Sequence, residues 1–174
     1  AYFSDFTHPI EKERQWLQKI KALTGADELL AVMSGDFLQN GLPAGETRKM
    51  RAQKGLQSGV DGVIEMSVYA SLSSVGIYAY SAARMLDKLK CVDTLVLETE
   101  APAELLDKIV YLSIANTREF QQKVTAYKTS GMPFYAASAK AIGEAIPGGE
   151  EAMLKWSNIF AVECIKALKM MYSS

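Results

Sequence analysis

The chain has 174 residues, of which 49% are hydrophobic and 22% charged, a balance typical of one globular domain with a buried core. Its formal net charge of −1 excludes a strong overall attraction to nucleic acid, so any such contact has to be local. Because no run of about 18 apolar residues occurs, we expect no membrane partner. Two cysteines without a predicted disulfide fit a reducing, cytoplasmic location.

The first part of the chain predicts strands that alternate with helices. Residues 1–6 predict the first strand, and Pro9 opens the first helix, which Gly25 ends. Further buried strands are expected at residues 28–33, 62–66 and 94–97. This alternation is typical of an open parallel doubly wound α/β sheet, with the first strand beside the second at the topological switch point.

The remaining part of the chain predicts helices only. Pro102 is expected to open one helix, and others are expected at residues 117–127, 135–146 and 150–171. The breakers at residues 131–133 and 147–149 are too short to be domain linkers. We therefore expect one domain, with an α/β core at residues 1–100 and a helical cap at residues 101–174 packed on it.

The cysteines and the single histidine limit the chemistry of any site. Cys91 and Cys164 lie in apolar periodic segments, which predicts two buried side chains and neither a disulfide nor a metal ligand. His8 alone provides no metal-ligand spacing, and it is explained more simply as a residue that precedes the first helix. We expect no metal site, and no residue is assigned as catalytic.

Ligands of an open parallel sheet bind beyond the carboxyl ends of its strands. Ser34 and Gly35 follow the second predicted strand, where small residues let a ligand approach the backbone, and Asp36 could hold a hydroxyl or cap the next turn. A tight turn without a ligand explains the same residues. We expect any bound nucleotide or anion near Thr7, Ser34 and Gly35.

Two groups of charged residues allow both a functional and a simpler explanation. The first group is a basic helical turn that consists of Arg48, Lys49, Arg51 and Lys54. It could meet a phosphate or RNA backbone, but a solvated helix face is the more common role of such a turn. Glu98 and Glu100 could similarly perform acid–base chemistry or remain solvated.

Several segments together resemble the bacterial tRNA-Met cytidine acetate ligase family, a group of HIGH-type nucleotidyltransferases. Residues 23–27 are similar to the family's LTGAD motif, and residues 31–44 are similar to VMSGNFxQRGxPA. Residues 51–53 resemble RAE, Ser74 lies in a segment similar to QSAxxFA, and residues 157–163 resemble NNILGIE. These matches occur in order along nearly the whole chain, which implies the Rossmann-like nucleotidyltransferase fold.

The resemblance implies ATP as the cofactor, acetate activated as acetyl-adenylate, and tRNA as a less strongly supported partner. It also implies candidate nucleotide-binding positions within or beside the matched segments. These candidates are Thr7, His8, Lys12, Ser34, Gly35, Asp36, Gln39, Arg51, Ser74 and Asn158.

The family's phosphate-binding HxGH motif has no counterpart in this chain. Counted back from Leu23 without gaps, the motif falls on Ile10, Glu11, Lys12 and Glu13, so both imidazole donors and the glycine are missing. Glu13 is expected to repel phosphate. We therefore predict a degenerate relative that binds a nucleotide or related small molecule weakly and does not ligate acetate to tRNA.

Two alternatives to the degenerate relative remain at the level of sequence. In one, the chain is an active transferase that uses Lys12, Asp36 and Arg51 around a metal-bound nucleotide. In the other, it is a non-catalytic subunit or scaffold. The sequence does not define an oligomeric state.

Overall fold

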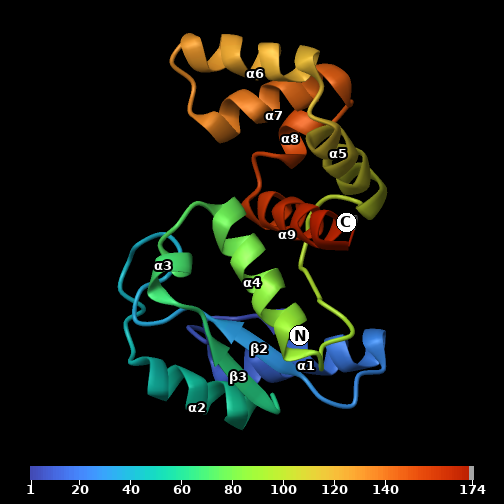
Figure 1. Ribbon diagram of the computed structural model, residues 1–174. Helices are drawn as coiled ribbons and strands as arrows, with labels where there is room; N and C mark the ends of the chain where they lie inside the picture. Colours follow the sequence, from blue (N-terminus) through green and yellow to red (C-terminus); the bar gives the residue numbers. More distant parts are fainter. Residues whose placement is uncertain (173–174) are drawn as a thin grey trace. The chain divides into compact units, whose positions relative to one another are not determined.

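The computed structural model describes residues 1–172, which form two compact units. The first unit is Ala1–Leu97 and contains the sheet, and the second begins at Glu98 and contains helices only. Figure 1 shows the helices and strands of each unit.

The sheet of the first unit is parallel, and its strand order is β1-β2-β3. The strands are β1 (Tyr2–Phe3), β2 (Leu30–Met33) and β3 (Gly62–Glu65). Tyr2 lies opposite Ala31 in β2 and also forms a parallel bridge with Val96, whose backbone N donates to the Ala1 carbonyl oxygen at 2.8 Å. The order of connection therefore reverses at β1, which confirms the doubly wound class and the position of the first strand beside the second.

All four predicted strands are shorter than expected, the first and the fourth most clearly. Residues 94–97 contribute only the single bridge at Val96. The first strand spans only Tyr2–Phe3, and Phe6, which was predicted within it, adopts a left-handed backbone conformation with φ 51° that extended strands do not contain.

Helices cover both faces of the sheet. They are α1 (Ile10–Thr24), α2 (Arg48–Ser58), α3 (Val68–Ser71) and α4 (Val75–Leu89). Tyr2 packs in one core cluster with Leu17 and Ile20 of α1, whereas the ring of Phe3, which points to the opposite face, lies 6.0 Å from that of Tyr78 in α4. Figure 1 accordingly shows α4 on one side of the sheet and α1 and α2 on the other.

The ends of α1 and α2 follow from local sequence signals. α1 begins after Pro9 and ends at Gly25, which has φ 64° and donates its N–H to the Lys21 carbonyl. The N-cap of α2 is Thr47, whose hydroxyl accepts from the Met50 backbone N–H at 3.3 Å.

The second unit consists of five helices among the described residues. They are α5 (Ala103–Ala115), α6 (Arg118–Thr129), α7 (Phe134–Ala145), α8 (Gly149–Ala152) and α9 (Trp156–Tyr172). The continuous helix expected at residues 150–171 is therefore wrong, because it is broken between α8 and α9. At this break the Asn158 side chain donates to the Ala152 carbonyl oxygen at 2.9 Å, in the place where a continuous helix would use the Trp156 N–H.

The two cysteines differ in their exposure. Cys164 is fully buried in α9, as predicted, but Cys91 is exposed because α4 has already ended at Leu89. Both are free thiols. No helix within residues 1–172 is both long enough and apolar enough to cross a membrane.

Candidate functional site

The carboxyl ends of the three strands bring polar residues together at one edge of the sheet. Asp5 follows β1, Ser34 and Gly35 follow β2, and Glu65 is the last residue of β3. A methyl group added at Gly35 would lie 2.9 Å from the Glu65 carboxylate oxygen, so a larger residue at this position would require the Glu65 side chain to move. Ser34 and Gly35 therefore lie at the carboxyl end of β2, where the sequence placed them.

Asp5 joins the end of β1 to the end of β2. Its carboxylate accepts from the Ser34 backbone N–H at 2.7 Å and lies 3.6 Å from the Arg51 guanidinium. Sequence reasoning missed Asp5, although an acidic residue at the end of a predicted apolar strand was a usable signal.

Arg51 contacts the ends of the same two strands through hydrogen bonds. Its side chain is fully buried, and its guanidinium donates to the carbonyl oxygens of Asp5 and Ser34, each at 3.0 Å. It also donates to the carbonyls of Gly35 and Glu46. The expectation of an exposed basic turn is wrong for Arg51, because buried carbonyl groups and Asp5 surround its charge.

Arg48 and Asp36 fix the start of α2. The Asp36 carboxylate accepts from the Arg48 backbone N–H at 3.3 Å, so Asp36 has the capping role that was one of its two predicted roles. The Arg48 guanidinium donates to Glu65 at 3.0 Å, and this hydrogen bond, together with the charges of Glu65 and Asp36, raises the pKa of Arg48. Arg48 is thus engaged with carboxylates of the site.

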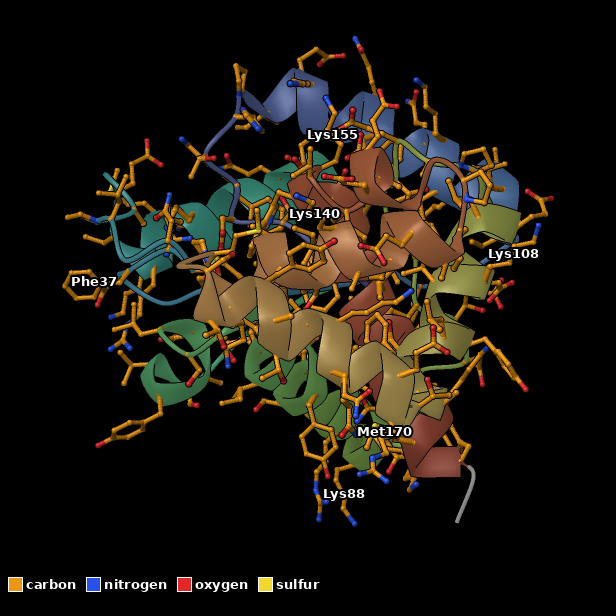
Figure 2. The ribbon with its side chains drawn as sticks, turned by 90° about the horizontal axis from the view of Figure 1, so that it is seen from above. Phe37, Lys88, Lys108, Lys140, Lys155 and Met170 are labelled. Atoms are coloured by element: carbon orange, nitrogen blue, oxygen red, sulfur yellow. The ribbon has the colours of Figure 1, made fainter. Side chains whose placement is uncertain are left out.

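The loop after β2 contacts the start of α4. Phe37 forms an antiparallel bridge with Pro43, and its side chain projects outward from the ribbon in Figure 2. The Gln39 side chain donates to the Ser73 carbonyl oxygen at 3.1 Å. The structure thereby brings Gln39 next to Ser74, which is exposed and precedes α4.

One charged side chain at the start of α1 is buried and not exposed as expected. Thr7, His8 and Lys12 are exposed, but Glu13 is only 6% exposed and accepts from the Tyr2 hydroxyl at 2.8 Å. Burial and the Glu13 charge raise the pKa of Tyr2. The expectation that Glu13 presents its carboxylate to a phosphate is therefore corrected, because this carboxylate faces Tyr2 in the interior.

Asn158 belongs to the second unit. Its side-chain oxygen accepts from the backbone N–H groups of Glu100 and Ala101 at 2.9 and 3.1 Å. Its side-chain nitrogen donates to the Ala152 carbonyl oxygen at the break between α8 and α9. It lines a cavity of about 310 Å³ together with Glu100 and Lys155, which are 3.4 Å apart. Glu98 and Glu100 are both exposed, which fits their simpler explanation as solvated charges.

Within residues 1–172, no group of three or more His, Cys, Asp or Glu side chains could hold a metal ion.

The chain is similar to known nucleotidyltransferases. The family model described as HIGH Nucleotidyl Transferase matches residues 14–174. The tRNA(Met) cytidine acetate ligase of Thermoanaerobacter sp. is 37% identical over 161 residues, which are 91% of this chain and 40% of that protein. The ligase of Clostridium perfringens is 29% identical over 168 residues, 91% of this chain and 42% of that protein.

Solved structures share the fold. Thermotoga maritima TmcAL bound with alpha-thio ATP has a TM-score of 0.89 at 24% identity and covers 99% of this chain and 43% of that chain. Apo TmcAL from the same organism has a TM-score of 0.85 at 27% identity and covers 99% of this chain and 42% of that chain. The chain thus spans about two fifths of the length of the relatives that it matches.

Proposed function

The chain belongs to the HIGH nucleotidyltransferase family, and we propose that it binds a nucleotide such as ATP weakly and does not ligate acetate to tRNA. Nucleotide binding is supported by a solved structure of similar fold that contains alpha-thio ATP. The proposed position is the carboxyl edge of the sheet, next to the start of α1, where Thr7, Ser34 and Gly35 lie.

The first turn of α1 carries this proposal. The resemblance places the HxGH motif at Ile10, Glu11, Lys12 and Glu13, and the family match begins directly after them, at Arg14. Lys12 is the one cation among residues 10–13. Both carboxylates of this turn already have partners, because Glu11 pairs with Arg14 at 3.0 Å and Glu13 accepts from the Tyr2 hydroxyl. Adenylation builds negative charge on the α-phosphate, and loss of one well-placed donor costs about 100- to 1,000-fold in rate.

The charges at the sheet edge also support weak binding of phosphate. Asp5, Asp36 and Glu65 contribute three carboxylates, whereas Arg48 and Arg51 contribute two guanidinium groups that already contact them or nearby carbonyls. One negative charge is left in excess. A triphosphate therefore gains no net attraction from these five side chains.

One polar atom at this edge supports a ligand. The Ser34 hydroxyl is buried and has no hydrogen-bond partner among the described residues. An unsatisfied buried hydroxyl costs about 1–3 kcal/mol, so a bound molecule or water that pairs with it would stabilise the site.

ATP binding and ATP–pyrophosphate exchange test the proposal. We expect calorimetry to give a dissociation constant for ATP well above about 1 μM, and Ser34→Ala to weaken binding further. We expect no exchange that depends on acetate, with the Thermoanaerobacter relative assayed in parallel as the positive control. Acetate-dependent exchange by this chain would contradict the loss of ligation, and absence of any ATP binding would contradict nucleotide binding.

The active-transferase alternative has less support. It requires Lys12, Asp36 and Arg51 around a metal-bound nucleotide, but Arg51 is fully buried and Asp36 caps α2. The same geometry is compatible with a non-catalytic subunit. Filter binding tests whether such a subunit contacts tRNA, by comparing its affinity for tRNA-Met with that for an unrelated tRNA.

A further inference from the structure

A second cavity lies within the helical unit. Its volume is about 180 Å³, and it is lined by residues of α5, α6, α7 and α9 and by Met153. This volume is close to that of the roughly 150 Å³ protein cavity that holds benzene. It is below the roughly 300 Å³ that pockets for drug-sized ligands reach, so a nucleoside triphosphate does not fit.

The wall of this cavity combines aromatic rings with an ion pair. Phe120, Phe134 and Tyr135 form its aromatic part, and the rings of Phe134 and Tyr135 meet edge to face at 5.2 Å. The Lys166 ammonium lies 3.0 Å from both carboxylate oxygens of Glu163, and both side chains line the cavity. Apolar surface and two opposite charges are thus presented to one small space.

The ion pair lies in a largely buried position. The side chains of Glu163 and Lys166 are only 14% and 24% exposed, so both charges are partly withdrawn from water. A helical pair of this spacing stabilises its helix only slightly. The ammonium has three N–H donors and the carboxylate about four acceptor positions, so the pair retains capacity for a ligand.

Ser138 adds a polar group to the wall of the same cavity. The residue is 9% exposed and lines the cavity next to the aromatic part and the ion pair. A serine hydroxyl can donate one hydrogen bond and accept others, so it can contact a carboxylate bound in the cavity.

We propose that this cavity binds a small zwitterion with an apolar body, of the class of a free apolar or aromatic α-amino acid. The ligand carboxylate contacts Lys166 and the Ser138 hydroxyl, and its ammonium contacts Glu163. The apolar body packs against Phe120 and Tyr135. This site does not depend on the proposed nucleotide site, because every residue that lines it belongs to the helical unit.

Calorimetry on the full chain with three probes tests this proposal. L-phenylalanine carries both charges, 3-phenylpropanoate lacks the ammonium, and 2-phenylethylamine lacks the carboxylate. We expect L-phenylalanine to bind with a dissociation constant below about 1 mM, and each single-charge probe to bind at least about tenfold more weakly. Failure of L-phenylalanine to bind at about 1 mM, or equal affinity for all three probes, would overturn the proposal.

Variants separate the site from a merely apolar cavity. Lys166→Met should weaken L-phenylalanine binding at least about tenfold, because the carboxylate loses its cation. Lys169→Met is the matched control on the same helix, since Lys169 is about half exposed and pairs with Asp107 at 3.5 Å. If circular dichroism shows that Lys166→Met is unfolded, Ser138→Ala gives the same comparison. Unchanged affinity in a folded variant of either residue would contradict the assignment.

Discussion

The hydrogen bond between Tyr2 and Glu13 gives the strongest test of the interior of the first unit. Tyr2 is 2% exposed, Glu13 is 6% exposed, and the hydroxyl donates to the carboxylate at 2.8 Å. Glu13→Ala leaves a buried hydroxyl without an acceptor, and Tyr2→Phe leaves a buried carboxylate without its donor. Each change is expected to lower the free energy of unfolding by about 1–3 kcal/mol.

A double-mutant cycle isolates the pair. Because the second change removes a partner that is already unpaired, the double variant should be less destabilised than the sum of the single variants, with a coupling energy of about 1–3 kcal/mol. Urea unfolding followed by Trp16 fluorescence measures this, because Trp16 packs on the same core cluster. Trp156→Phe removes the other tryptophan, which lies in the second unit. Additive costs, with a coupling below about 0.5 kcal/mol, would refute the interaction.

The same pair determines how the lost motif has to be rebuilt. Replacing Ile10, Lys12 and Glu13 by His, Gly and His removes the acceptor of the Tyr2 hydroxyl, so the reconstruction should be made together with Tyr2→Phe. We expect the combined variant to remain folded and to bind ATP more tightly than the unaltered chain in calorimetry. If the folded variant does not bind ATP more tightly, the crevice has been remodelled beyond the motif.

Other outcomes follow from single side chains. The raised pKa of Tyr2 means that its contribution to stability is fully present below about pH 10 and is lost as the pH rises further, so Tyr2→Phe should flatten this alkaline decline in urea unfolding; an identical decline would contradict it. Arg51→Lys should lower the free energy of unfolding by about 2–4 kcal/mol, because several buried carbonyls lose their donors. Arg48 is half exposed, so Arg48→Lys should lower it by less than about 1 kcal/mol. Equal losses in urea unfolding would contradict the buried position of Arg51. A thiol reagent should modify Cys91 quickly and leave Cys164 intact in the folded chain, because burial raises the pKa of Cys164; two fast thiols by mass spectrometry would contradict this.

Local signals in the sequence determined the arrangement of the first unit. Short runs of Leu, Ile and Val predict strands buried on both faces, and Gly25 ends a helix by a backbone conformation that depends on the residue itself. Ser34 and Gly35 then follow β2 at the carboxyl edge of the sheet, which is where the topology of a parallel sheet predicts that ligands bind. The resemblance added the family, which the comparisons with known proteins support over most of the chain.

Only the tertiary structure decided the environment of individual side chains. Arg51 appears on a basic turn in the sequence, but it is buried because the carbonyl of Asp5, 46 residues away, accepts its hydrogen bond. Glu13 is turned inward by Tyr2, and Asn158 helps break a helix through a hydrogen bond to Ala152. Whether a polar side chain contacts solvent, ligand or backbone depends on partners distant in the chain, and periodicity contains no information about those partners.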